Sequence, residues 1–101
     1  MSAVDDRGRL ADTRITRALA WSPGLALTWT VMRGVLLVTP DPAGDFHLTA
    51  KGHVRIPAPL RHHCALTPGD RVLMAADPST SRLTIYPPAT LDTLLADGAG
   101  R

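Results

Sequence analysis

The stretch that decides the fold is Leu19-Ala20-Trp21-Ser22-Pro23-Gly24, because it returns 45 residues later as Cys64-Ala65-Leu66-Thr67-Pro68-Gly69. Upstream, Arg7-Gly8-Arg9-Leu10 aligns with Lys51-Gly52-His53-Val54 at an offset of 44. Downstream, Leu27 aligns with Val72 at the same offset of 45, and residues 35–40 match residues 83–88 once three extra residues are allowed in the loop of the second copy. Each copy therefore has the same order: a basic motif with a glycine, a short helix, a Pro-Gly turn, and two strands joined by a turn.

Local patterns in the first copy support this order. Ile15, Ala18 and Leu19 fall at helical spacing on one face, whereas Arg14 and Arg17 lie off that face. We therefore expect one face of this short helix to pack and the other to be free for binding.

The two strands of the first copy follow its Pro-Gly turn. Large apolar residues alternate along 25–32 with a second set of mostly smaller or polar ones, which predicts a half-buried strand; the first set is Leu25, Leu27, Trp29 and Val31, and the second is Ala26, Thr28, Thr30 and Met32. Arg33-Gly34 is a two-residue connection in which Gly34 can adopt a positive φ, so residues 35–39 are predicted to return as the antiparallel partner. The same reasoning in the second copy predicts strands over 46–50 and 53–56, a helix over 58–64, and a hairpin over 71–76 and 83–86.

The segment 40–45 is the predicted linker between the copies, since its two prolines lack backbone donors and its glycine adds freedom. It separates a first half-unit, 4–40, from a second, 46–88, and residues 89–101 are expected to form a short helix and tail. Each half has one hairpin and one short helix, too little to bury a core alone. The predicted fold class is therefore mainly β with short helices, built from two half-units in one chain.

Composition limits the class of protein. With 101 residues, 45% of them hydrophobic and 20% charged, the chain fits one folded domain of ordinary composition, and a homodimer could add buried surface. No apolar run reaches the roughly 18 residues of a membrane span, and residues 1–9 carry charges where a signal peptide would be apolar. A single cysteine, Cys64, agrees with a reducing compartment. We expect a cytoplasmic protein with no membrane partner.

Basic side chains gather in two stretches although the net charge is only +2. Residues 7–17 contain four arginines and one aspartate, and residues 46–69 contain three basic side chains and all four histidines with no acid. This distribution is typical of a surface that meets an anion, most commonly a phosphate backbone. Solvated surface charge remains the alternative interpretation.

The second copy also carries a family resemblance. Its run Gly52-His53-Val54-Arg55-Ile56-Pro57-Ala58-Pro59-Leu60-Arg61, followed by Ala65-Leu66-Thr67-Pro68-Gly69-Asp70-Arg71-Val72, resembles the signature of the AbrB/MazE/SpoVT family of transition regulators and antitoxins. The first copy keeps Asp5-Asp6-Arg7-Gly8-Arg9-Leu10, similar to the family's Asp-x-x-Gly-Arg opening, but lacks its Ile-Pro dipeptide. The resemblance covers about residues 4–88.

The resemblance implies a swapped-hairpin β-barrel, with both interleaved halves in one chain as in the tandem MraZ-like members. It implies a transcriptional regulator that binds double-stranded DNA through basic side chains of the Gly-Arg strand and the short helix. Arg9, Arg17 and Arg61 stand at such motif positions, and His53 and His62 replace basic residues of the pattern. Four more residues join the predicted DNA-binding set by proximity: Arg7, Arg14, Lys51 and Arg55.

Three other functions are conceivable for this sequence: a protein-interaction module, a metal-binding protein and an enzyme. A protein-interaction module, such as an antitoxin with a partner toxin, stays open, although only 13 residues follow Pro88 for a toxin-binding tail. His62-His63-Cys64 has poor spacing for a metal, because adjacent helical residues point about 100° apart, and Cys64 aligns with the expected core residue Leu19. The chain has no glutamate and no motif for a nucleophile, base and orienting acid. We expect no metal, no cofactor and no enzymatic activity.

Overall fold

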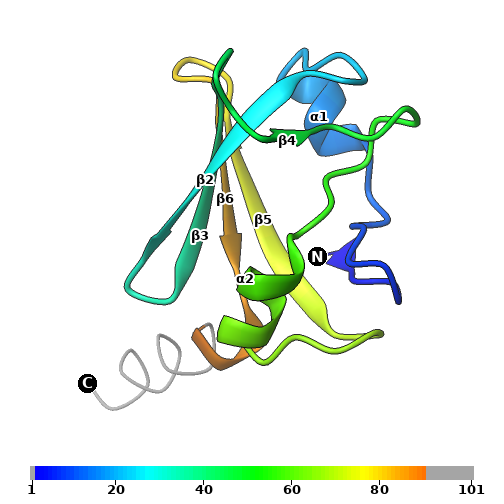
Figure 1. Cartoon of the computed structure of the whole chain (residues 1–101), viewed down its shortest axis with the longest axis vertical. Helices are drawn as coiled ribbons and strands as arrows, with labels where there is room; N and C mark the ends of the chain where they lie inside the picture. Colours follow the sequence, from blue (N-terminus) through cyan, green and yellow to red (C-terminus); the bar gives the residue numbers. More distant parts are fainter. Residues whose placement is uncertain (1, 91–101) are drawn as a thin grey trace.

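The computed structural model describes residues 2–90 and shows a mainly β protein (Figure 1). A six-stranded antiparallel sheet curls into a half-barrel with the strand order β1-β5-β6-β3-β2-β4. The elements are β1 (Ser2–Ala3), α1 (Arg14–Ala18), β2 (Ala26–Met32), β3 (Val35–Pro40), β4 (Phe46–His47), α2 (Ala58–His63), β5 (Arg71–Asp77) and β6 (Arg82–Tyr86). The helices α1 and α2 lie at opposite ends of the half-barrel. No helix among the described residues is long and apolar enough to cross a membrane.

Two hairpins form the centre of the sheet. In the turn between β2 and β3, Arg33 and Gly34 both have positive φ, +53° and +77°, as a type I′ turn requires. The positive φ predicted for Gly34 is confirmed. The β2–β3 hairpin joins the β5–β6 hairpin through β3 and β6, where Val38 pairs with Leu83 and both side chains are fully buried.

The short strands β1 and β4 connect the two copies. β1 of the first copy pairs with β5 of the second, with Ala3 opposite Arg71, and β4 of the second copy pairs with β2 of the first, with His47 opposite Ala26. These two pairs are equivalent at the offsets of 44 and 45 residues in the sequence repeat. Each copy therefore adds its first strand to the hairpin of the other copy.

The backbone repeats the same geometry at the end of each helix. Ala20 and Ala65, 45 residues apart, both adopt the left-handed conformation with φ of +58° and +53°. Gly24 donates its N–H to Leu48 O at 2.9 Å, and Gly69, its repeat equivalent, donates to a carbonyl of the opposite copy at 2.8 Å.

The core lies inside the curl of the sheet and takes side chains from both copies. Trp21 is buried, and its indole Nε1 donates to Ser81 Oγ at 2.9 Å, which joins the first Pro-Gly turn to the second hairpin. Leu10 and Val54, from the two basic motifs, are also buried. The remaining buried apolar residues are Val4, Leu19, Leu27, Leu36, Val38, Leu48, Ile56, Leu66, Val72, Leu83, Ile85 and Pro87.

The structure confirms Ile15 and Leu19 on the predicted packing face of the first helix and corrects the third residue, Ala18. Ala18 is exposed and Thr16 is buried instead. The hydroxyl of Thr16 donates to Thr13 O at 2.9 Å or to Gly52 O at 3.0 Å. The hydrogen-bonding capacity of this hydroxyl is therefore met, and Thr16 is buried where the apolar pattern predicted that Ala18 would be. The five-residue helix is too short for the spacing of apolar residues to fix one face.

The predicted strands around the linker are also shorter than expected. Only Phe46–His47 of residues 46–50 pair as a strand, and residues 53–56 make a single bridge, through Arg55, rather than a full strand. The predicted alternation of buried and exposed residues does not extend to the end of β2, where Val31 and Met32 are both exposed. The predicted C-terminal helix lies outside the described residues, apart from its first residues.

Candidate functional site

Two segments far apart in the sequence, residues 7–11 and 51–57, cross in antiparallel orientation, and we call this pair the basic ribbon. Arg9 and Arg55 stand directly opposite each other in an isolated bridge. Leu10 N donates to Val54 O at 2.8 Å, and Ile56 N donates to a carbonyl of the first segment at the same distance. Since side chains alternate across extended backbone, the buried Leu10, Val54 and Ile56 anchor one face. The two arginines share the outward face.

Each segment of the ribbon begins with a tight turn built by one side chain. In the first turn, Asp5 Oδ1 accepts the N–H groups of Arg7 at 2.9 Å and Arg9 at 2.8 Å, and Asp5 O accepts from Gly8 N at 3.1 Å. Gly8 has a φ of +81°, which glycine adopts without a Cβ penalty. The turn therefore fixes the backbone positions from which the side chains of Arg7 and Arg9 extend.

The second turn repeats this geometry with a different residue. Thr49 Oγ1 accepts from His53 N at 2.9 Å, Thr49 O accepts from Gly52 N at 2.9 Å, and Gly52 has a φ of +82°. Thr49 thus takes the place of Asp5 but brings no negative charge. Sequence reasoning did not include Thr49 or Asp5 among the site residues, although the offset of 44 aligns one with the other.

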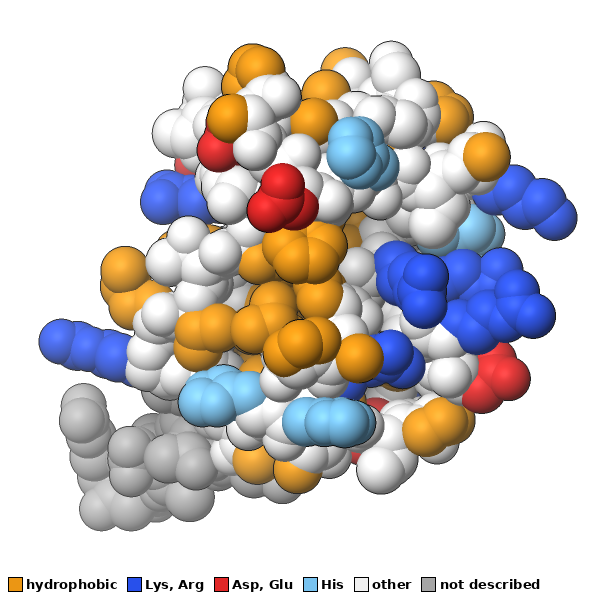
Figure 2. All heavy atoms as spheres, in the orientation of Figure 1, with side chains coloured by type: hydrophobic (Ala, Val, Ile, Leu, Met, Phe, Trp, Pro, Cys, Tyr) orange, Lys and Arg blue, Asp and Glu red, His pale blue; other side chains and the backbone are white. Residues whose placement is uncertain are grey.

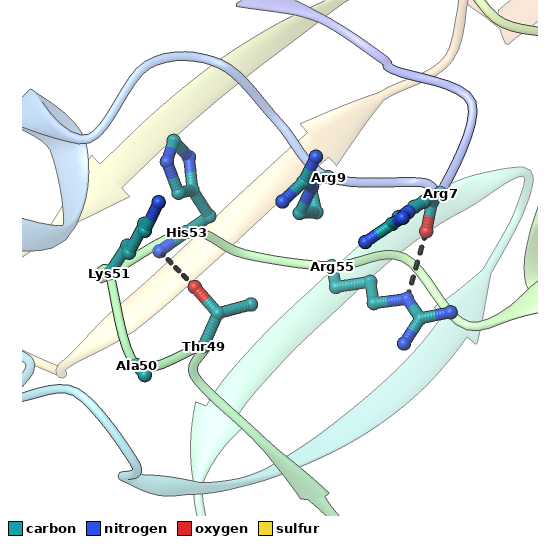
Figure 3. A pocket seen from close by; sticks show the side chains of 7 residues that line it. All are labelled: Arg7, Arg9, Thr49, Ala50, Lys51, His53 and Arg55. Carbon is teal, nitrogen blue, oxygen red and sulfur yellow. Dashed lines mark hydrogen bonds between the residues drawn. The ribbon is translucent and has the colours of Figure 1, made fainter.

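The outward side chains of the ribbon are partly held in place (Figure 3). Arg9 Nε donates to Asp5 Oδ2 at 2.6 Å in an ion pair, and Arg55 Nε donates to Arg7 O at 2.8 Å. His53 Nδ1 lies 2.8 Å from the backbone oxygen of Leu10. Because a carbonyl oxygen can only accept, this contact requires the hydrogen of His53 on Nδ1.

The electrostatics of the site follow from these contacts. Burial tends to raise the pKa of Asp5, but the backbone N–H of Arg9, its guanidinium and the N–H of Arg7 outweigh that effect and lower the pKa overall. Asp5 therefore stays ionised and holds the first turn. Arg9 and Arg55, two like charges in direct opposition, repel each other unless a counter-charge lies near both.

The ribbon forms the floor of a shallow pocket of about 290 Å³. The residues that line it are Arg7, Arg9, Thr49, Ala50, Lys51, His53 and Arg55. Lys and Arg side chains gather over this side of the molecule, at the right of Figure 2. The pocket therefore carries four cationic groups on one surface.

The structure brings together five of the nine residues predicted from the sequence and leaves four apart from the pocket. The five that line the same pocket are Arg7, Arg9, Lys51, His53 and Arg55. Arg14 is exposed and pairs with Asp12 at 3.1 Å in another shallow depression, and Arg17 is exposed in the last turn of α1. His62 is exposed on α2.

Arg61 has a structural contact that the sequence did not indicate. Its side chain lies beside Gly8, where an added Cβ would be only 2.8 Å from Arg61 Nε. That Nε is buried and has no hydrogen-bond partner among the described residues. Arg61 also lines a second depression together with Arg55, so it borders the ribbon from the side of α2.

The cysteine and histidines of α2 do not come together as a metal site. Within residues 2–90, no three His, Cys, Asp or Glu side chains are grouped to hold a metal ion. Cys64 is half-buried against the core, and burial raises the pKa of its thiol. It therefore stays protonated at neutral pH.

Comparisons with models of protein families, with curated proteins and with solved structures found no match to this chain. The fold and the site define a mainly β protein in which two segments far apart in the sequence form one basic surface.

Proposed function

We propose that this chain binds double-stranded DNA through the basic ribbon and acts as a transcriptional regulator of the AbrB/MazE/SpoVT type. One observation carries the proposal: Arg7, Arg9, Lys51 and Arg55 converge on one pocket although they come from segments more than 40 residues apart. Such convergence is not expected of scattered surface charge. It supplies the local positive potential that a phosphate backbone requires.

The shape of the site favours duplex DNA over single strands. The two extended segments of the basic ribbon are joined by one bridge, and paired segments lie only about 4.8 Å apart, so they are narrow enough to face the major groove, which is roughly 12 Å wide. Binding of single strands usually needs exposed aromatic side chains as stacking platforms. The ribbon pocket is lined by no Phe, Trp or Tyr among the described residues.

The strand pairing also supports the particular fold that the family resemblance implies. We infer a swapped-hairpin barrel closed within one chain, because β1 and β4 each join the hairpin of the opposite copy. The basic motifs that resemble the family signature are also the segments that form the ribbon.

The test compares two pairs of substitutions with the same loss of charge. Lys51→Ala/Arg55→Ala removes two ribbon charges, and Arg33→Ala/Arg82→Ala removes two charges at the hairpin ends, where both line the same depression on the sheet. Duplex affinity is measured by fluorescence anisotropy over a salt series, and thermal unfolding confirms that each variant is folded. We expect the ribbon pair to lose at least about tenfold in affinity and the hairpin pair to lose much less.

Two results would contradict the proposal. Wild-type protein that binds no duplex at low salt would exclude DNA binding, and equal losses for the two pairs would exclude the ribbon as the contact surface. Either result would favour the alternative that the chain is a protein-interaction module.

A further inference from the structure

The repeat relates the two ends of the basic ribbon by an approximate two-fold rotation, although among the described residues only the end with Arg9 and Arg55 is bridged. Leu10 and Val54 are equivalent positions of the repeat, 44 residues apart, and Leu10 N donates to Val54 O at 2.8 Å. In an antiparallel ladder, two equivalent residues that face each other lie on a local two-fold axis. The ribbon therefore has two ends related by rotation, and the offset of 44 states which residues correspond.

The two ends carry different side chains. We call Arg7, Arg9 and Arg55 the arginine end, because Arg55 Nε donates to Arg7 O and Arg55 lies opposite Arg9. The equivalent positions at the other end are Lys51, His53 and Ala11, and we call them the lysine end. A duplex with two-fold symmetry would thus meet two chemically different surfaces.

At the arginine end, two guanidinium groups are oriented for directional contacts. Arg9 uses Nε for Asp5, and Arg55 uses Nε for the carbonyl of Arg7. Their terminal Nη groups make no hydrogen bond to a described residue. A guanidinium fixed through Nε presents two parallel donors, the arrangement that pairs with O6 and N7 of guanine.

The arginine end also contains the carboxylates Asp5 and Asp6, whereas the lysine end has Thr49 and Ala50 in their places. Carboxylates weaken the attraction to phosphate. Asp5 is already engaged by the first turn and by Arg9, but the exposed Asp6 can accept from the N4 amino group of cytosine, so this mixed set of Arg and Asp is better suited to base edges than to the backbone.

The lysine end has the opposite character. Lys51 is exposed and makes no ion pair among the described residues, so it is a mobile point charge suited to phosphate. His53, when neutral, keeps its hydrogen on Nδ1 for Leu10 O. Its Nε2 is then an acceptor and offers no donor to a phosphate oxygen.

From these differences we infer a division of labour, which rests on the proposed binding of duplex DNA. The arginine end reads base pairs, and the lysine end anchors the phosphate backbone without sequence preference. A single chain then recognises a site whose essential base pairs lie in one half, so the preferred site is not a palindrome.

The experiment starts by selecting a duplex site from a random pool and comparing it with a scrambled duplex of equal length. Affinities for both duplexes are measured over a salt series for wild type, Arg55→Lys, Arg9→Ala and Lys51→Ala. Arg55→Lys keeps the positive charge but loses the two parallel donors of the guanidinium group, so it separates base reading from electrostatic attraction. Thermal unfolding is measured for each variant.

We expect Arg55→Lys to bind the selected duplex about 5- to 150-fold more weakly and the scrambled duplex almost unchanged. Arg9→Ala also removes a charge, so it should weaken binding to both duplexes, and to the selected duplex by a clearly larger factor. Lys51→Ala should weaken binding to both duplexes equally and lower the magnitude of the log K against log salt slope by about 0.9. Single base-pair changes that weaken binding should cluster in one half of the selected site. Native mass spectrometry should show one chain bound to each duplex.

Several outcomes would overturn the inference while duplex binding stands: no preference of wild type for the selected duplex, full specificity in Arg55→Lys, or loss of specificity in Lys51→Ala. Essential base pairs spread evenly over both halves, or a complex that forms only with two chains, would overturn it as well. Absence of any duplex binding would instead refute the proposed function itself.

Discussion

Gly8 and Gly52 offer a matched pair for testing how the ribbon is built. They are equivalent in the repeat and have nearly the same φ, +81° and +82°. A Cβ at Gly8 would lie 2.7 Å from Ile56 O and 2.8 Å from Arg61 Nε, whereas a Cβ at Gly52 would meet no described atom within 4 Å. The substitutions Gly8→Ala and Gly52→Ala therefore share one cost and differ in another.

The shared cost is the left-handed conformation, about 1–2 kcal/mol for a residue with a Cβ. The additional cost at Gly8 is overpacking. Ile56 O belongs to the backbone, and Ile56 N donates to Gly8 O at 2.8 Å, so the contact cannot relax without disturbing the ribbon. Overpacking typically costs about 1–3 kcal/mol. We expect the free energy of unfolding to fall by about 1–2 kcal/mol in Gly52→Ala and by about 2–5 kcal/mol in Gly8→Ala.

Urea denaturation followed by the fluorescence of the buried Trp21 measures both values. The m-value should stay constant, so that a shift of the midpoint reports stability alone. Equal losses for the two variants would refute the reasoning, because they would mean that Gly8 is not packed against the second segment and that the ribbon does not close as described.

Two further predictions concern the first turn and the dependence of the halves on each other. Asp5→Asn should lower the melting temperature at pH 7, because a carboxylate whose pKa is lowered in the folded state stabilises it above that pKa; the difference from wild type should shrink below about pH 4 as the carboxylate is protonated, and Asp6→Asn is the control. Residues 1–43 and 44–101, expressed separately, should show no cooperative thermal unfolding by circular dichroism, since β1 and β4 each pair with the other fragment; a fragment that unfolds cooperatively as a monomer would contradict this interdependence.

Local pattern was enough to predict both hairpins and both short helices. The type I′ turn at Arg33-Gly34 follows from the glycine, whereas the buried pairs of β3 and β6 do not follow from local pattern, because residues 35–38 are a continuous apolar run. The exposure of Phe46 did not follow, because β4 is an edge strand of two residues. Its repeat equivalent, Ser2, is the residue that is buried.

The candidate site was predictable only as a set of residue types. The family motif indicated Arg9, and proximity to the motif indicated Arg55, but their direct opposition depends on pairing between residues 46 positions apart. The role of Thr49 could not be seen either, because in the second turn its hydroxyl takes the place that the carboxylate of Asp5 has in the first. The offset of 44 aligns Thr49 with Asp5, but it indicates a shared role only when the geometry of the two turns is known.

Two copies in one chain also explain how such a ribbon can differ at its two ends. In a homodimer of half-units every substitution occurs twice, so a change that suits one end is imposed on the other. Within one chain, Leu10 and Val54 keep the shared apolar centre, whereas Arg9 and His53 differ without changing the backbone turn before each of them. The core positions must fit each other, but the outward positions are constrained only by what they contact. Unequal ends are therefore the expected result of joining the copies, and a symmetric target would leave one of them without its best partner.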